Sequence, residues 1–95
     1  MTVKNAKAKG SRQEHRTMKL LEASGYACTR AAASLGAWDV VAIGSADIVL
    51  VQCKTRDWPS SEEMERLRLF RAPTNARKLV HRYRDGQRLP DVREL

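Results

Sequence analysis

Residues 38–54 read WDVVAIGSADIVLVQCK. The two arms of this stretch, residues 38–43 and 48–54, are rich in β-branched and other apolar side chains, which favour strands. Between the arms, residues 44–47 (GSAD) have the composition and length of a hairpin turn. The second arm is apolar at consecutive positions, which indicates a strand covered on both faces. The stretch therefore predicts a central antiparallel hairpin with a layer of structure on each side.

Two helices can provide those layers. The first is expected over residues 11–24, where SRQE at 11–14 fits a capping box and Gly25 supplies a stop. The second is expected to follow another capping-box pattern, SSEE at 60–63, and to extend to about residue 72.

The remaining segments complete an α/β domain. Residues 26–31 predict a short strand before the hairpin, and the alternation over 78–84 predicts an outer strand. Pro90 is expected to keep the last residues irregular. Residues 1–10 hold three Lys, no acid and no apolar periodicity, so they are predicted to be a flexible basic arm ahead of a single domain at 11–95. The expected order is αβββαβ.

Composition narrows the function. The chain has 95 residues, with 18 Lys and Arg against 11 Asp and Glu, and a formal net charge of +7. No run approaches the ~18 apolar residues of a membrane span. The N-terminus lacks the apolar run of a secretory signal, and two Cys with two His form neither a zinc pattern nor a disulfide framework. A cytoplasmic domain with a polyanionic partner remains, and nucleic acid is the default partner; no membrane and no small organic cofactor are expected.

Four polar residues interrupt the apolar pattern. Asp39 lies inside the first arm of the hairpin, and Gln52 and Lys54 end the second arm on one face. Because the turn is short, Asp39 should meet the Gln52–Lys54 end across the hairpin. Glu14 shares the apolar face of the first helix and should point toward the sheet. Polar groups that converge in this way are costly to bury unless the protein uses them.

These residues resemble the PD-(D/E)XK nuclease superfamily and, within it, the archaeal-type Holliday junction resolvases and their phage relatives. The resemblance covers residues 10 to about 84 and rests on Gly10-x-x-x-Glu14, Gly25-Tyr26, Arg30, Ser34-x-Gly36, Asp39-Val-Val-Ala and Gln52-Cys53-Lys54. It implies a restriction-endonuclease-like fold with a central mixed sheet, and a divalent-metal-dependent endodeoxyribonuclease that cuts structured DNA, most simply a four-way junction.

The resemblance also implies roles for individual residues. Asp39, Gln52, the backbone carbonyl of Cys53 and Glu14 would hold Mg²⁺ or Mn²⁺. Lys54 would position the attacking water or steady the developing charge. Ser34 corresponds to a serine that some members of the family need for activity. Such parts suit phosphodiester hydrolysis, which requires charge neutralisation and a delivered water.

Two positions depart from the family pattern. Gln52 stands where the second acid is usual, so the site has one negative charge fewer. His15 stands where junction resolvases often carry a basic residue beside the helix Glu.

Basic side chains outside the site are expected to bind DNA phosphates. The candidates are Lys7, Lys9, Arg12, Arg30, Arg56, Arg82 and Arg84. His81, between strand arginines, is expected at the surface or facing DNA. A homodimer is expected because a junction needs two symmetric cuts, with Leu69, Phe70 and Tyr83 as its candidate surface.

Structural roles remain open for the same residues. Glu14 can be the partner of Ser11 in the capping box, and Asp39 can be a strand-end residue that pairs with Arg30 or Lys54. Lys54 can be a solvated strand terminus, Gln52 a satisfied structural amide, and Ser34 a residue that caps a loop. A nuclease of other specificity, such as a nicking or repair enzyme, and a non-catalytic nucleic-acid-binding module are the alternative functions.

Overall fold

The architecture is seen in a computed structural model that describes residues 2–31 and 36–95, with the backbone alone for residues 2–11. Within these residues the chain forms α1 (Thr2–Ala23), β1 (Ala27–Arg30), β2 (Val40–Ile43), β3 (Ile48–Thr55), α2 (Ser61–Leu69), β4 (Ala76–Tyr83) and β5 (Asp91–Glu94). None of the described helices is long and apolar enough to cross a membrane.

One mixed sheet holds the strands in the order β1-β2-β3-β4-β5. The predicted hairpin is confirmed: β2 and β3 are antiparallel, with Ile43 opposite Ile48 and Val40 opposite Val51. The chain then crosses one face of the sheet through α2 and returns as β4, which is parallel to β3. β4 pairs with β5 and β2 with β1, both antiparallel. β3 therefore has a strand on each side.

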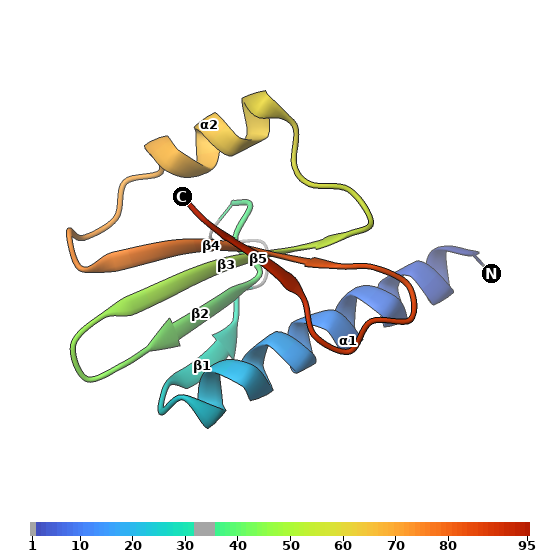
Figure 1. Cartoon of the computed structure of the whole chain (residues 1–95), viewed down its shortest axis with the longest axis horizontal. Helices are drawn as coiled ribbons and strands as arrows, with labels where there is room; N and C mark the ends of the chain where they lie inside the picture. Colours follow the sequence, from blue (N-terminus) through green and yellow to red (C-terminus); the bar gives the residue numbers. More distant parts are fainter. Residues whose placement is uncertain (1, 32–35) are drawn as a thin grey trace.

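The two helices cover opposite faces of the sheet, as Figure 1 shows. Side chains alternate along a strand, so Val49 and Val51 of β3 enter the core beneath α1 while Leu50 enters the core beneath α2. Met64 and Leu67 are the buried residues of α2 and pack in the second core. Coverage of β3 on both faces, as its sequence predicts, is confirmed.

Polar contacts also fasten α1 to the sheet. Thr17 is fully buried, and its hydroxyl lies 2.8 Å from the Tyr83 hydroxyl, 3.0 Å from Nδ1 of His81 and 3.4 Å from Sγ of Cys53. A buried hydroxyl with several partners satisfies groups that would otherwise be costly inside a core. This cluster holds the middle of α1 against β3 and β4.

The second predicted capping box is confirmed and the first is wrong. Ser60 caps α2: its Oγ accepts from the backbone N–H of Glu63 at 3.2 Å, and its own N–H donates to Glu63 Oε1 at 3.1 Å. Ser11 lies inside α1, because that helix begins at Thr2. Residues 4–9 contain only one residue that is not Ala or Lys, both good helix formers. These residues thus form helix without an apolar pattern. The division of the chain into an arm and a domain stays a prediction.

The C-terminal prediction is wrong in one respect. Residues 91–94 form β5, so β4 lies inside the sheet and is not its outer strand. His81 and Tyr83 of this inner strand face α1, so they are only 4% and 2% exposed and neither is a surface residue. The sequence DVRE of β5 carries three charged residues, which hides the strand from pattern analysis. Charged residues are also usual on an edge strand, where they discourage pairing with another chain.

We expect acid to weaken the fold through His81. Burial lowers the pKa of His81 to about 4 from the ordinary value of 6.5. Between these values the unfolded chain binds the proton and the folded chain does not, so the free energy of unfolding should fall as the pH decreases from 6.5 to 4. The loss attributable to this residue is about 3 kcal/mol at most. Denaturant titrations across this range measure it.

The matched variants are His81→Leu and His15→Leu. His81→Leu removes the buried imidazole and should flatten the dependence on pH in this range, whereas His15→Leu removes an exposed one and should leave it unchanged. If the free energy of unfolding fell equally in wild type and His81→Leu as the pH decreased, His81 would not be the cause of the acid sensitivity.

Candidate active site

The hairpin brings Asp39 to the end of β3. Just before β2 begins, the Asp39 N–H donates to the Val51 carbonyl at 2.8 Å, which continues the ladder by one residue. The backbone N–H of Cys53 then donates to Oδ2 of Asp39, also at 2.8 Å. The hydrogen bond fixes the carboxylate beside the Gln52–Lys54 segment. Asp39 and the end of β3 meet as the hairpin geometry predicts.

The charges of two other residues influence the pKa of Asp39. Burial raises the pKa of its carboxyl above the ordinary value, and the negative charge of Glu14 raises it as well; the Cys53 N–H and the positive charge of Lys54 oppose both effects. Glu14 comes from α1 and Lys54 from β3, so two elements supply charges to one point. The structure therefore brings Glu14, Asp39 and Lys54 together.

Glu14 lies on the side of α1 that approaches β1. Its side chain is 20% exposed, and Oε1 accepts a hydrogen bond from Nε of Arg30 at 2.8 Å. The capping interpretation of Glu14 is wrong because the residue is far inside the helix. Arg30 thus holds the helix acid close to Asp39, in addition to its predicted contact with DNA.

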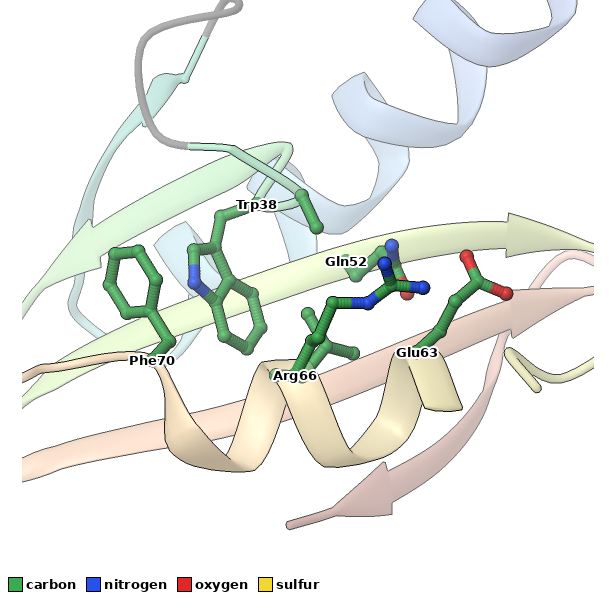
Figure 2. Close-up of a pocket in the computed structure, with 7 residues that line it drawn as sticks. Trp38, Gln52, Glu63, Arg66 and Phe70 are labelled. Atoms are coloured by element: carbon green, nitrogen blue, oxygen red, sulfur yellow. The ribbon is translucent and has the colours of Figure 1, made fainter. Parts of the chain in front are cut away.

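Gln52 faces α2. It is 8% exposed, and its Oε1 is buried without a hydrogen-bond partner in the part of the chain that the structure describes. The side chain lines a cavity of about 380 Å³ together with Ala37, Trp38, Glu63, Arg66, Leu67 and Phe70. Figure 2 shows the Gln52 amide and the Glu63 carboxylate directed into this cavity. A buried acceptor of this kind needs a water, a donor or a cation to be satisfied.

Glu63 also lies near the site, although the sequence did not predict it as a site residue. The hydrogen bond from the Ser60 N–H lowers the pKa of Glu63, and the charge of Lys54 lowers it further. Lys54 therefore lies within electrostatic reach of Asp39 on one side and Glu63 on the other. The capping box soon after QCK is the available signal, because a helix that begins there places its first turn over the end of β3.

The donors suit a hard divalent cation that retains water. Asp39 and Glu14 offer carboxylate oxygens, and Gln52 has an amide oxygen that lacks a partner. Mg²⁺ requires only one or two carboxylates. Burial raises the pKa of the Cys53 thiol to about 12, so a ligand from this residue would be its carbonyl, not its sulfur. Among residues 2–31 and 36–95, no three His, Cys, Asp or Glu side chains form a metal-binding group.

The predicted DNA-binding residues fall into different environments. Arg12, Arg56 and Arg84 are exposed, and Arg56 has a left-handed φ of 68° directly after β3. The strand arginines Arg82 and Arg84, expected to bind DNA, are both paired with an acid of the fold. Asp91 of β5 contacts Arg82 at 2.7 Å and Arg84 at 3.3 Å, since the register places Asp91 opposite Arg82.

The side chains of three predicted functional residues are not among those that the structure describes. Ser34 is outside the described residues, and the side chains of Lys7 and Lys9 are outside them as well, although their backbone is part of α1. Their roles stay predictions.

We expect Gln52→Glu to tighten the binding of a divalent ion by on the order of tenfold, because charge on the ligands tunes the affinity for hard cations. Asp39→Asn should weaken binding for the same reason. Calorimetric titration of Mn²⁺ in the absence of DNA measures both changes without reference to activity. Unchanged Mn²⁺ affinity in Gln52→Glu, with an unchanged melting temperature, would make Gln52 a structural amide.

Comparison with known proteins gives two findings. The sequence matches the family described as archaeal Holliday junction resolvase (hjc) over residues 5–81. The structure resembles the 1.6 Å structure of Hjc, a Holliday junction resolvase from the archaeal hyperthermophile Archaeoglobus fulgidus, with a TM-score of 0.66 and 24% sequence identity over 92% of this chain and 71% of that chain. At that identity the resemblance shows a shared fold, and the expected α/β architecture is confirmed. Comparison with curated proteins gives no match.

Proposed function

The chain belongs to the archaeal Holliday junction resolvase family, and from that premise we propose that it cuts four-way DNA junctions by divalent-metal-dependent hydrolysis of phosphodiester bonds. Membership identifies the chain as a nuclease that acts on DNA junctions. The observation that carries the chemistry is the Asp39 carboxylate, which the Cys53 N–H holds at the end of β3 and on which the charges of Glu14 and Lys54 act, inside the matched segment. We expect such an enzyme to act in the cellular compartment that contains the DNA.

Each side chain has a definable task. Asp39, fixed by the Cys53 N–H, and Glu14, fixed by Arg30, would hold the metal together with the Gln52 oxygen. The ion supplies charge neutralisation at the phosphate and a water of lowered pKa. Lys54, whose charge acts on Asp39, would stabilise negative charge that develops on the phosphate oxygens.

The presence of Gln52 favours one alternative function, a module that binds junctions without cutting them. A site with one charge fewer than usual could bind junctions without cutting them, since binding depends on phosphate contacts elsewhere. The same cleavage experiment separates the two functions.

We expect a four-way junction to be cleaved in the presence of Mg²⁺ or Mn²⁺ and to remain intact in EDTA. Mn²⁺ should support cleavage at least as well as Mg²⁺, because a site that relies on a neutral amide suits the ion with higher affinity for neutral ligands. Labelled junction, linear duplex and single strand, incubated in parallel, measure both activity and selectivity. Full cleavage in EDTA would refute the mechanism, and binding without cleavage in either metal would favour the binding module.

Asp39→Ala and Lys54→Ala should each abolish cleavage while junction affinity stays within a few-fold of wild type. The exposed residues Glu22 and Lys19, in the C-terminal part of α1, provide the controls Glu22→Ala and Lys19→Ala, which each remove one charge of the same sign. Wild-type rates in Asp39→Ala or Lys54→Ala would return that residue to a structural role.

We also propose a two-fold homodimer, because resolution of a junction needs two symmetric cuts and an isologous dimer supplies two centres. Leu69, at the end of α2, is 71% exposed and remains a candidate contact, whereas Tyr83 is buried and leaves the predicted surface. Light scattering at micromolar concentration should report a dimer, free or junction-bound. A monomer in both states would contradict this proposal and favour a nicking enzyme.

A further inference from the structure

A second cavity, of about 310 Å³, lies between α1 and the segment that joins β4 to β5. Its walls are Arg12, Gln13 and Arg16 from the helix, Tyr83 from the end of β4 and residues 84–88 from the connecting segment. Figure 1 shows this connection beside α1, on the far side of the sheet from α2. We call this second cavity the arginine groove.

The charge of the arginine groove is strongly positive. Arg12, Arg16, Arg84 and Arg88 line it and are exposed, and Asp85 is the acid in its wall. Four guanidinium groups around a concave surface concentrate positive potential and present planar donor pairs that match phosphate oxygens.

Local contacts hold two of these arginines at the groove. Arg16 donates to the Gln87 carbonyl at 3.4 Å, which ties α1 to the connecting segment. Arg84 donates to Gln87 Oε1 at 3.2 Å and lies 3.3 Å from Asp91, whose shorter contact, at 2.7 Å, is with Arg82. Each guanidinium has five donors, so these contacts leave donors for a ligand. The groove is therefore partly organised before anything binds.

The groove adjoins the candidate active site. β3 and β4 are parallel, so their C-terminal ends reach the same edge of the sheet, with Thr55 opposite Tyr83. Thr55 follows Lys54 and donates to Oε1 of Gln13 at 3.0 Å, and Gln13 is itself part of the groove wall. The Thr55–Gln13 hydrogen bond thus links the end of β3 that carries Lys54 to the wall of the groove. A DNA strand that passes over this edge of the sheet can contact both.

We propose that the arginine groove binds backbone phosphates of the strand being cut, a few nucleotides from the scissile bond. This inference rests on the proposed function, since it assigns a subsite to the same substrate. It separates the predicted arginines by role: Arg82, covered by Asp91 and by the ring of Trp58 at 4.5 Å, belongs to the fold, whereas Arg12 and Arg84 join Arg16 and Arg88 in the groove. The groove sets which phosphate reaches Asp39 and Lys54.

The first test is the salt dependence of junction binding in EDTA, where no cleavage occurs on the proposed mechanism. The double variant Arg16→Gln/Arg88→Gln should bind more weakly than wild type by on the order of tenfold, and the slope of log affinity against log salt should become shallower by about one per arginine. The control, Arg68→Gln/Arg71→Gln, removes the same charge from exposed positions at the α2 end of the molecule. A slope for the groove variant equal to that of the control would overturn the proposal.

The second test locates the contact. Junctions carry a single neutral methylphosphonate at successive positions on each side of the cut, and wild type should lose affinity at one or two adjacent positions. Arg16→Gln/Arg88→Gln should be insensitive at those positions, because the partner of the phosphate is gone. Equal sensitivity in wild type and variant would place those phosphates elsewhere and overturn the proposal.

These measurements distinguish the two proposals. Binding slopes and methylphosphonate effects do not require cleavage, so a junction that binds in the groove but is not cut refutes the proposed chemistry and supports the subsite. Should the double variant unfold, Arg88→Glu alone tests the same contact through a larger loss of affinity than Arg71→Glu.

Discussion

Burial of β3 on both faces is the constraint on which the rest of the structure depends. Val49 and Val51 are covered on one side and Leu50 on the other, so the chain must supply a layer to each face. α1 forms one layer, and α2 forms the other as part of the connection to β4. That connection makes β4 parallel to β3 and places the ends of both strands at one edge of the sheet.

The candidate active site lies where this double coverage ends. Beyond Val51, β3 changes from apolar to polar residues, and Asp39 lies against its backbone. Each helix contributes an acid there: Glu14 from α1 raises the pKa of Asp39, and the charge of Lys54 lowers the pKa of Glu63 in the first turn of α2. The arginine groove lies at the same edge because β4 ends beside β3. The layers that bury the strand thus also position the charges around its end.

Local patterns predicted the parts of the fold whose determinants are close together in sequence. The hairpin over residues 38–54 and the cap at Ser60 were found because a turn, a β-branched run and a capping box are each defined within a few residues. Asp39 opposite the end of β3 followed from the short turn alone. β5 and the early start of α1 were missed, since a charged edge strand and a helix start composed mainly of Lys and Ala have no apolar pattern to detect.

The sequence by itself determined the central hairpin, the excess of positive charge and the meeting of Asp39 with Lys54, because each depends on composition or on neighbours along the chain. Only the tertiary structure decided the surroundings of these residues. It buried His81 beneath α1, paired Arg82 with Asp91, left the Gln52 oxygen without a partner among the described residues and brought Arg16 to Gln87. These environments depend on sheet order and register and on how the helices pack, which no local pattern encodes.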